Sequence, residues 1–171
     1  KRGRLRVALV TTAKYFLPRI LGEFCQRYPE ISIELEIANR ERIVDRLRGN
    51  RDDLYVMSYP PEDIDVVTTP FLENEHVVVA PPGHWAAKKR VSLDALGDEP
   101  FLLREQGSGS RHAIDSYLQS QGKRLNVRLS LASNEAIREL VASGMGLAVL
   151  SRHSLGDAAA RGEIAILRVE D

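Results

Sequence analysis

Hydroxyl and amide side chains gather at three short turns of the sequence, each between a predicted strand and a predicted helix. These turns are Thr11-Thr12, Ser108-Gly109-Ser110 and Ser133-Asn134. In open α/β sheets such turns lie at the carboxyl ends of strands, where ligands bind. The free N–H groups at the start of the following helix and the positive end of its dipole favour anions. The three turns therefore predict contacts to a small anion.

Cationic side chains flank two of these turns. Lys14, Arg104 and Arg111 have the charge and the donors to pair with a carboxylate or a phosphate. The sequence thus predicts a small anionic metabolite as the ligand. Ser, Thr and Asn also commonly cap helices, and each turn taken alone is about three times more often a cap than a ligand contact. Both interpretations stay open, because convergence of the turns into one site is assumed from the architecture.

No pattern of catalytic residues is evident in the sequence. Four histidines lack the short spacings of metal sites, so we expect each at the surface or at a cap: His76, His84, His112 and His153. Residues 107–111 match neither a G-x-S-x-G nucleophile elbow, nor a dinucleotide fingerprint, nor a P-loop. Asp52 and Asp53 are adjacent, so their carboxylates point apart and we expect them to be solvated. We therefore expect no catalytic residue, no metal site and no cofactor.

The elements around the first turn alternate between strand and helix. Residues 5–10 form a short apolar run typical of a strand, and apolar residues recur at helical spacing over 16–28. Ile31–Ala38 alternates apolar and polar residues, which predicts a half-buried strand near a sheet edge. A helix capped by Asn39 and a buried strand over 54–57 follow. This order favours a parallel sheet with right-handed crossovers.

The alternation restarts in the second half of the chain. A strand-rich stretch over 66–80 leads to Pro81-Pro82-Gly83, where we expect the chain to cross into another domain. The elements predicted beyond it are strands over 101–103, 127–131 and 147–150 and helices over 111–121 and 136–142. Two such modules joined at a hinge describe a bilobed α/β protein.

The composition is that of an ordinary globular protein, with 43% hydrophobic and 28% charged residues among 171. The 24 Lys and Arg balance 24 Asp and Glu, so no net positive field attracts nucleic acid at long range. No apolar run is long enough to span a bilayer, and no secretory signal opens the chain. Cys25 is the single cysteine, and its apolar neighbours predict a buried thiol. We expect a cytoplasmic protein.

Six segments, in the order of the chain, resemble one family. They are TTAKYFLP (11–18), NRE (39–41), the stretch from PF to PPGH (70–84), FLLREQGSGSR (101–111), SNEAI (133–137) and GMGLAVLSRH (144–153). Together they resemble the effector-binding domain of LysR-type transcriptional regulators, and in particular the branch that controls carbon-dioxide-fixation (Calvin cycle) genes. The resemblance covers nearly the whole chain.

The resemblance implies an α/β fold of two Rossmann-like subdomains joined by a two-stranded hinge, which is the periplasmic-binding-protein-like (type 2) fold. It implies subdomain I over 1–81, subdomain II over 82–167 and a second crossover over 168–171. In the family, residues beyond 168 complete subdomain I, and we expect them to be largely absent here. The family also carries a winged helix-turn-helix before this domain, so we expect contact with DNA only through that missing part.

The resemblance also implies an effector in the cleft between the subdomains. The matching positions are Thr11, Thr12, Arg104, Ser108, Ser110, Ser133 and Asn134. Lys14, Gly109 and Arg111 join this set from the turns alone. Effectors of the branch are phosphorylated sugars, related organic acids or NADPH, all of them anions. The resemblance further implies a homodimer, for which we expect the first helix and Ile31–Ala38 to supply the surface, and a tetramer in the full-length protein, with no membrane partner.

We therefore predict a regulatory, non-enzymatic domain that senses a small anion and relays its binding to winged helix-turn-helix domains. A solute-binding protein of a transport system on the same fold is the alternative, and the lack of a signal peptide argues against it. An enzyme on a bilobed fold, such as a deaminase or a dehydratase, is a further alternative that would need a convergent acid–base pair.

Overall fold

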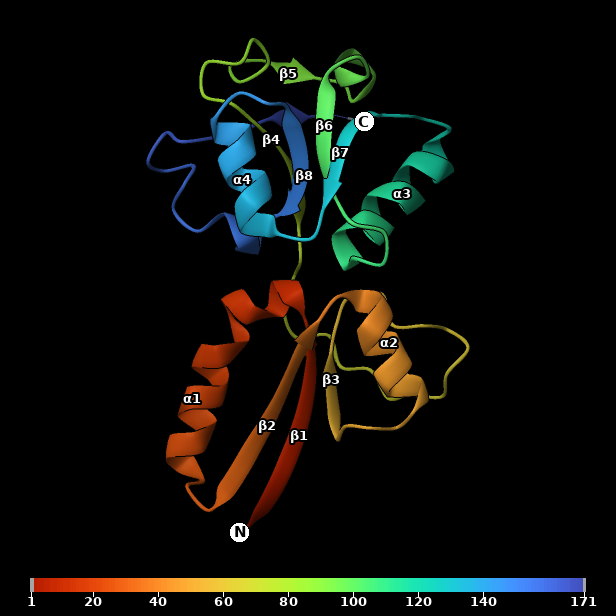
Figure 1. Cartoon of the computed structure of the whole chain (residues 1–171), viewed down its shortest axis with the longest axis vertical. Coiled ribbons are helices and arrows are strands. Elements are labelled where there is room, and N and C mark those ends of the chain that lie inside the picture. Colours follow the sequence, from red (N-terminus) through yellow and green to blue (C-terminus); the bar gives the residue numbers. More distant parts are fainter. Residues whose placement is uncertain (1, 171) are drawn as a thin grey trace. The chain divides into compact units, whose positions relative to one another are not determined.

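The structure is a computed structural model that describes residues 2–170 (Figure 1). Internal contacts divide the chain into two units, of which the first ends at Glu73 and the second begins at Asn74. The subdomain boundaries expected at residues 81 and 168 stay predictions. Residues 1 and 171, which the expected first subdomain and second crossover include, lie outside the described residues.

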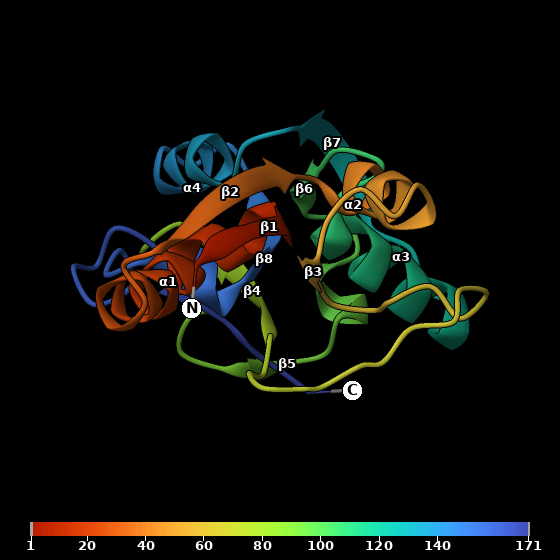
Figure 2. The ribbon, with the colours of Figure 1, turned by 90° about the horizontal axis from the view of Figure 1, so that it is seen from below.

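A three-stranded parallel sheet in the order β2-β1-β3 forms the centre of the first unit. Its elements are β1 (Gly3–Val10), β2 (Ile31–Ala38), β3 (Leu54–Val56), α1 (Leu17–Arg27) and α2 (Arg40–Arg48). Side chains alternate across β1, because Val7 packs with Leu17 of α1, whereas Ala8 packs with Ile43 of α2. The helices therefore cover opposite faces of the sheet (Figure 2). The expected edge position of β2 is confirmed.

Local side chains set where the helices of the first unit begin. Asn39 accepts the N–H of Arg42 at 3.1 Å, which confirms the predicted cap of α2. Pro18 lies in the first turn of α1, where its missing N–H costs no hydrogen bond. A short 3-10 helix, η1 (Thr11–Tyr15), occupies the predicted polar turn. Thr11 and Thr12 therefore lie at the start of η1, a short helix that precedes α1.

Two expectations about the first half of the chain are wrong. The expected strand-rich stretch over 66–80 holds one strand, β4 (His76–Ala80), and residues 66–75 form neither strand nor helix. Val67 is 98% exposed, so its β-branched side chain has no sheet to pack against. Cys25, expected to be buried, is exposed, because α1 buries only Leu17 among its residues.

The two neighbouring aspartates of the first unit point apart, as predicted, but they are not equally solvated. Asp52 is buried, and its carboxylate accepts two 2.8 Å hydrogen bonds from Arg46. These bonds hold the pKa of Asp52 below its ordinary value. Asp53 pairs instead with Arg6 at the surface. The expectation of solvation is therefore wrong for Asp52, which fixes the end of α2.

A five-stranded mixed sheet in the order β7-β6-β8-β4-β9 forms the centre of the second unit. The strands that follow β4 are β6 (Pro100–Arg104), β7 (Asn126–Leu131), β8 (Leu147–Ser151) and β9 (Ala165–Ile166). The strand β6 is parallel to β7 and β8, whereas β4 runs antiparallel to β8 and β9. The carboxyl ends of β6, β7 and β8 therefore share one edge of the sheet.

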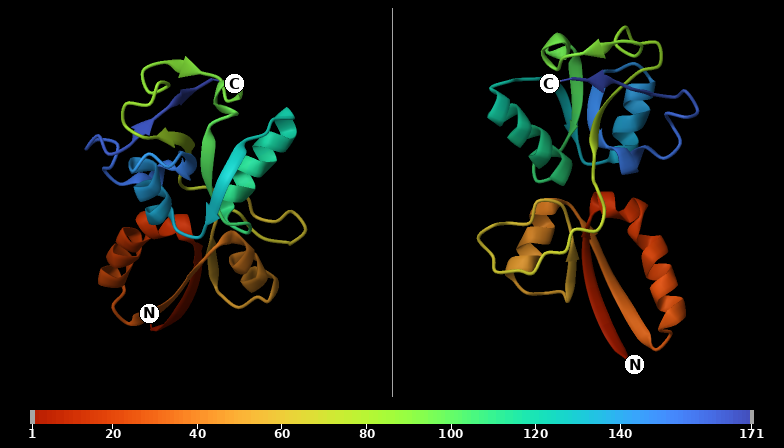
Figure 3. Two further views of the ribbon diagram at one scale, coloured as in Figure 1. Left: turned by 45° about the horizontal axis from the view of Figure 1, so that its top comes forward. Right: turned by 180° about the vertical axis from the view of Figure 1, so that it is seen from behind.

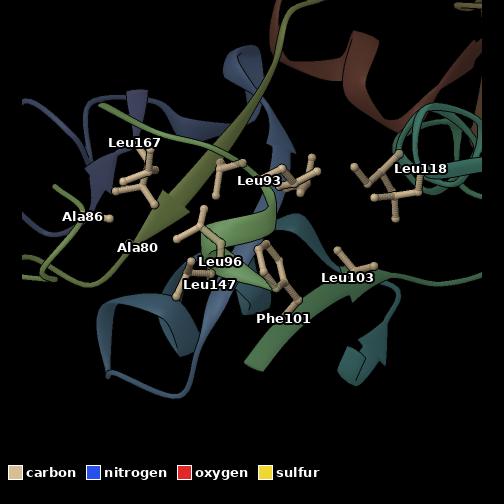
Figure 4. Packing of buried hydrophobic residues seen from close by; sticks show 13 residues of the cluster. Ala80, Ala86, Leu93, Leu96, Phe101, Leu103, Leu118, Leu147 and Leu167 are labelled. Carbon is tan, nitrogen blue, oxygen red and sulfur yellow. The ribbon is translucent and has the colours of Figure 1, made fainter. Parts of the chain in front are cut away.

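Two helices cover opposite faces of this sheet, α3 (Gly109–Gln121) and α4 (Asn134–Ala142) (Figure 3). Leu118 of α3 packs in one cluster with Phe101, which is fully buried (Figure 4). Ile137 of α4 packs in a second cluster with Leu102, the next residue of β6. Successive residues of β6 point to opposite faces of the sheet, so each helix packs against one face of the same sheet. The first turns of both helices lie at the carboxyl edge of this sheet.

Short elements complete the second unit. The strands β5 (Arg90–Val91) and β10 (Arg168–Val169) pair in parallel as a separate sheet. Two 3-10 helices are η2 (Asp94–Leu96) and η3 (Arg152–Leu155). Gly146 precedes β8 where a side chain would collide with the backbone oxygen of Pro100, so this position requires glycine.

Candidate anion-binding site

Two of the predicted turns begin the helices of the second unit. Ser108 Oγ accepts the N–H of Arg111 at 3.2 Å at the start of α3, and Ser133 Oγ accepts the N–H of Ala136 at 3.1 Å at the start of α4. The capping interpretation thus holds for both serines. A hydroxyl that accepts an N–H still keeps its own proton to donate. Capping therefore leaves each serine able to bind an anion as well.

Arg104 connects the end of β6 to the start of α4. Its side chain is 3% exposed, and Nη1 donates to Asn134 Oδ1 at 2.7 Å while Nη2 donates to Glu105 Oε1 at 2.7 Å. The Nε–H has no hydrogen-bond partner within residues 2–170. Buried donors are almost always paired, so an unpaired guanidinium nitrogen requires an explanation. This N–H is therefore a donor that could pair with an acceptor outside the described residues.

Arg111 fastens α3 to the strands beside it. Its Nη1 donates to the backbone oxygen of Arg104 at 3.1 Å and to Ser130 Oγ of β7 at 3.0 Å, and its Nε pairs with Asp115 at 3.0 Å. The same guanidinium thus holds β6, β7 and α3 together. A contact from Arg111 to a ligand stays a prediction, and these bonds indicate that its first role is to hold the site in shape.

Ser110 has a partner that the sequence did not indicate. Its Oγ lies 3.2 Å from Nε2 of His76, the first residue of β4. Burial lowers the pKa of His76 below its ordinary value. The expectation that His76 lies at the surface or at a cap is therefore wrong. Alternation along β4 could have placed His76 on the face of Val78, but the sequence does not show that α3 covers this face.

The remaining predicted contacts belong to the first unit. Thr11 and Thr12 begin η1, and neither hydroxyl has a hydrogen-bond partner in the part of the chain that the structure describes. Thr12 is buried and Thr11 half-buried, so an unused hydroxyl there is a donor held in place. The Nζ of Lys14 lies 5.1 Å from the ring centre of Tyr15. These residues offer two hydroxyls and one cation.

The structure brings most of the second unit's predicted residues into one cluster. Hydrogen bonds link Ser108 to Arg111, Arg111 to the Arg104 carbonyl, and the Arg104 side chain to Asn134; Ser133 precedes Asn134, and Gly109 is the first residue of α3. We call this set, together with Ser110, the helix-start cluster. It offers hydroxyl donors, two helix starts and a buried cation, a combination that suits a small anion.

Two other kinds of site are not evident between residues 2 and 170. No group of three or more His, Cys, Asp and Glu side chains could hold a metal ion among these residues. No helix among them is long and apolar enough to cross a membrane.

Comparisons with known proteins point to one family. The family described as LysR substrate binding domain matches residues 1–171. The HTH-type transcriptional activator CmpR of Synechocystis is 46% identical over 171 residues, which cover 99% of this chain and 56% of that protein. The RuBisCO operon transcriptional regulator of Acidithiobacillus ferrooxidans is 42% identical over 170 residues, covering 99% and 55%. The chain thus spans just over half the length of these relatives.

Solved structures agree with this result. The Synechocystis CcmR regulatory domain, in complex with 2-PG, has a TM-score of 0.92 and 48% sequence identity, covering 99% of this chain and 82% of that one. The effector binding domain of QuiR has a TM-score of 0.84 at 19% identity, covering 100% and 82%, which shows the fold alone. The predicted periplasmic-binding-protein-like (type 2) fold is confirmed.

Proposed function

This chain belongs to the LysR substrate binding domain family, and we propose that it senses a small anionic metabolite and thereby regulates carbon-fixation genes. The predicted resemblance is confirmed: the chain is an effector domain of the LysR type, close to regulators named CmpR and RuBisCO operon regulator. Because it spans just over half the length of those relatives, control of genes, contact with DNA through a winged helix-turn-helix and a place in the cytoplasm all belong to the proposal.

The observation that carries the proposal is the buried cation of the helix-start cluster. Arg104 is 3% exposed and its Nε–H is unpaired within the described chain. Removing a cation from water is costly unless acceptors surround it. Ser108 and Ser133 keep hydroxyl protons at the starts of α3 and α4, and the dipoles of these two helices add positive potential. An anion bound there would supply the missing acceptor.

The ligand we propose first is 2-PG, because the CcmR regulatory domain, which is 48% identical, was solved in complex with it. Phosphorylated sugars, related organic acids and NADPH remain candidates, because all of them are anions as well. In the first unit, Thr11, Thr12 and Lys14 are proposed effector contacts, supported by the hydroxyls of the two threonines, which have no partner among residues 2–170. The role is that of a binding module, with no catalytic step assigned to it.

Calorimetric titration of the chain with 2-PG tests the proposal. We expect saturable binding that Ser110→Ala weakens about tenfold or more, since a hydrogen bond to a charged group contributes about 1.5–3 kcal/mol. Ser116→Ala is the matched control, because Ser116 is an exposed serine of the same helix. Equal affinities for both variants would place the ligand elsewhere, and no response to 2-PG or to a panel of phosphorylated metabolites would contradict the proposed function.

The proposal includes a homodimer, with a tetramer in the full-length protein. The edge strand β2 exposes Leu35 and Ile37, and α1 of the same unit exposes Ile20. An unpaired sheet edge beside exposed apolar residues favours association. We expect sedimentation to show a dimer that Leu35→Lys converts to a monomer. A monomeric unmodified chain at tens of micromolar protein would contradict this part of the proposal.

A further inference from the structure

A half-buried histidine reaches the helix-start cluster through a serine. Nε2 of His76 lies 3.2 Å from Oγ of Ser110, which is 6% exposed in the first turn of α3. His76 shares its face of β4 with Val78 and Ala80, and both pack in one cluster with Ile114 of α3. Packing of the helix on the sheet therefore fixes the distance between imidazole and hydroxyl.

We propose that His76 orients the Ser110 hydroxyl toward the ligand and takes up a proton from solvent when a phosphate monoester binds. This inference rests on the function proposed above and adds to it a positioning residue, a ligand class and a dependence on pH.

The protonation state of His76 decides where the Ser110 proton points. A neutral imidazole either donates from Nε2 to Ser110 or accepts the Ser110 proton there. In the second case the Ser110 proton is engaged with His76 and cannot form a hydrogen bond to the ligand. A doubly protonated imidazole can only donate, so Ser110 must direct its own proton to another acceptor. An anion at the start of α3 is such an acceptor, and protonation of His76 and anion binding therefore favour each other.

The charged groups around His76 are engaged with other partners. Glu75 pairs with Arg152 at 2.7 Å, and Arg111 pairs with Asp115 at 3.0 Å. The two strands that flank β4 are β8 and β9, and neither holds a charged residue within its bounds. Charged residues of α4 lie on a helix that packs against the opposite face. A bound anion would therefore be the main new charge that acts on His76.

The charge of the ligand sets the size of the effect. Burial keeps the pKa of His76 below its ordinary value, which favours the neutral imidazole in the free protein. A negative charge within about 4–6 Å raises the pKa of a histidine. A phosphate monoester carries about −1.5 to −2 at pH 7, whereas a carboxylate carries one charge. The coupling should therefore favour phosphate monoesters over carboxylates, and more strongly as the pH falls.

Calorimetry with 2-PG from about pH 6.5 to 8, in buffers of different ionisation enthalpy, tests this inference. The unmodified chain should gain affinity as the pH falls, approaching about tenfold per pH unit, with uptake approaching about one proton per ligand. His76→Gln keeps an N–H at the place of Nε2 but does not titrate, so it should bind 2-PG without this uptake. His84→Gln changes a histidine whose ring contacts Glu99 and the N–H of Ala86, beyond the other end of β4, and should behave like the unmodified chain.

The outcomes separate the inference from the function it rests on. Binding with the same pH dependence in His76→Gln would overturn the role of His76 and leave the sensor intact. No binding of 2-PG or of inorganic phosphate by the unmodified chain would overturn both. If His76→Gln does not fold, the ring resonances of His76 in the unmodified chain decide the matter. They should titrate at higher pH with 2-PG than without it, and an unchanged titration would overturn the inference.

Discussion

Two arginines, one in each unit, differ in how completely acceptors surround them. Arg46 of α2 donates from Nε and Nη2 to both oxygens of Asp52 at 2.8 Å, and its Nη1 lies 3.9 Å from Glu36. Arg104 of β6 has the amide of Asn134 and the carboxylate of its neighbour Glu105, and its Nε is unpaired among the described residues.

The more deeply buried of the two is the less well satisfied. The side chain of Arg46 is 26% exposed and that of Arg104 is 3% exposed. If Arg104 served packing alone, we would expect it to have more hydrogen-bond acceptors than Arg46, because it is less accessible to water. The contrast shows that acceptors of its own unit surround Arg46, whereas Arg104 keeps one donor, Nε–H, without a partner among the described residues.

Replacing each arginine should separate binding from stability, and this is the largest effect we expect. Arg104→Gln should weaken 2-PG binding by roughly ten- to hundredfold, since a charged hydrogen bond contributes about 1.5–3 kcal/mol. Arg46→Gln should leave the affinity unchanged and lower the unfolding temperature, because it leaves Asp52 buried without a cation. Calorimetry and thermal unfolding measure both. Equal losses of affinity in the two variants would contradict the different roles proposed for Arg104 and Arg46.

Helix caps extend the comparison to a smaller effect. Asn39 caps α2 and Ser108 caps α3 in the same manner. Asn39→Ala and Ser108→Ala should each destabilise the protein by about 1 kcal/mol, measured by denaturant unfolding. Only Ser108→Ala should also reduce the stabilisation that 2-PG confers, because only that hydroxyl has a proposed ligand to donate to. Loss of ligand stabilisation in Asn39→Ala would contradict the assignment.

Acid unfolding gives the smallest effect and tests the first unit alone. The pKa of Asp52 is lowered by Arg46, so the pair stabilises the folded state above the unfolded pKa, and this is lost as the pH falls through the folded pKa. We expect a loss of stability below about pH 4 that is reduced in Asp52→Asn. Glu34→Gln is the control, since its pair with Arg4 in the same unit is exposed and contributes little. A matching change in Glu34→Gln would contradict this explanation.

The sequence predicted the features that local chemistry determines. The alternation of Ile31–Ala38 predicted an edge strand, and Asn39, Ser108 and Ser133 were recognised as residues that start helices. Each of these signals is contained in a few consecutive residues, because strand faces repeat every second residue and caps bond two or three positions ahead.

The sequence did not predict contacts between distant residues. His76 and Ser110 meet only because α3 packs over β4, and Arg104 reaches Asn134 only because α4 returns to the carboxyl edge of the same sheet. The β-branched residues over 66–69 indicated a strand, but no neighbouring strand pairs with them. Pairing and packing across the chain decide such cases, and the type of a single residue does not reveal them.

Nuclear magnetic resonance of the isotope-labelled chain during titration with 2-PG tests most directly whether Arg104 is the cation that receives the ligand. We expect the side-chain Nε–H signal of Arg104 to shift saturably, together with the backbone amides at the starts of α3 and α4, while the Nε–H signal of Arg46 stays in place. Saturable binding that leaves the Arg104 signal unmoved would contradict the central role given to this residue.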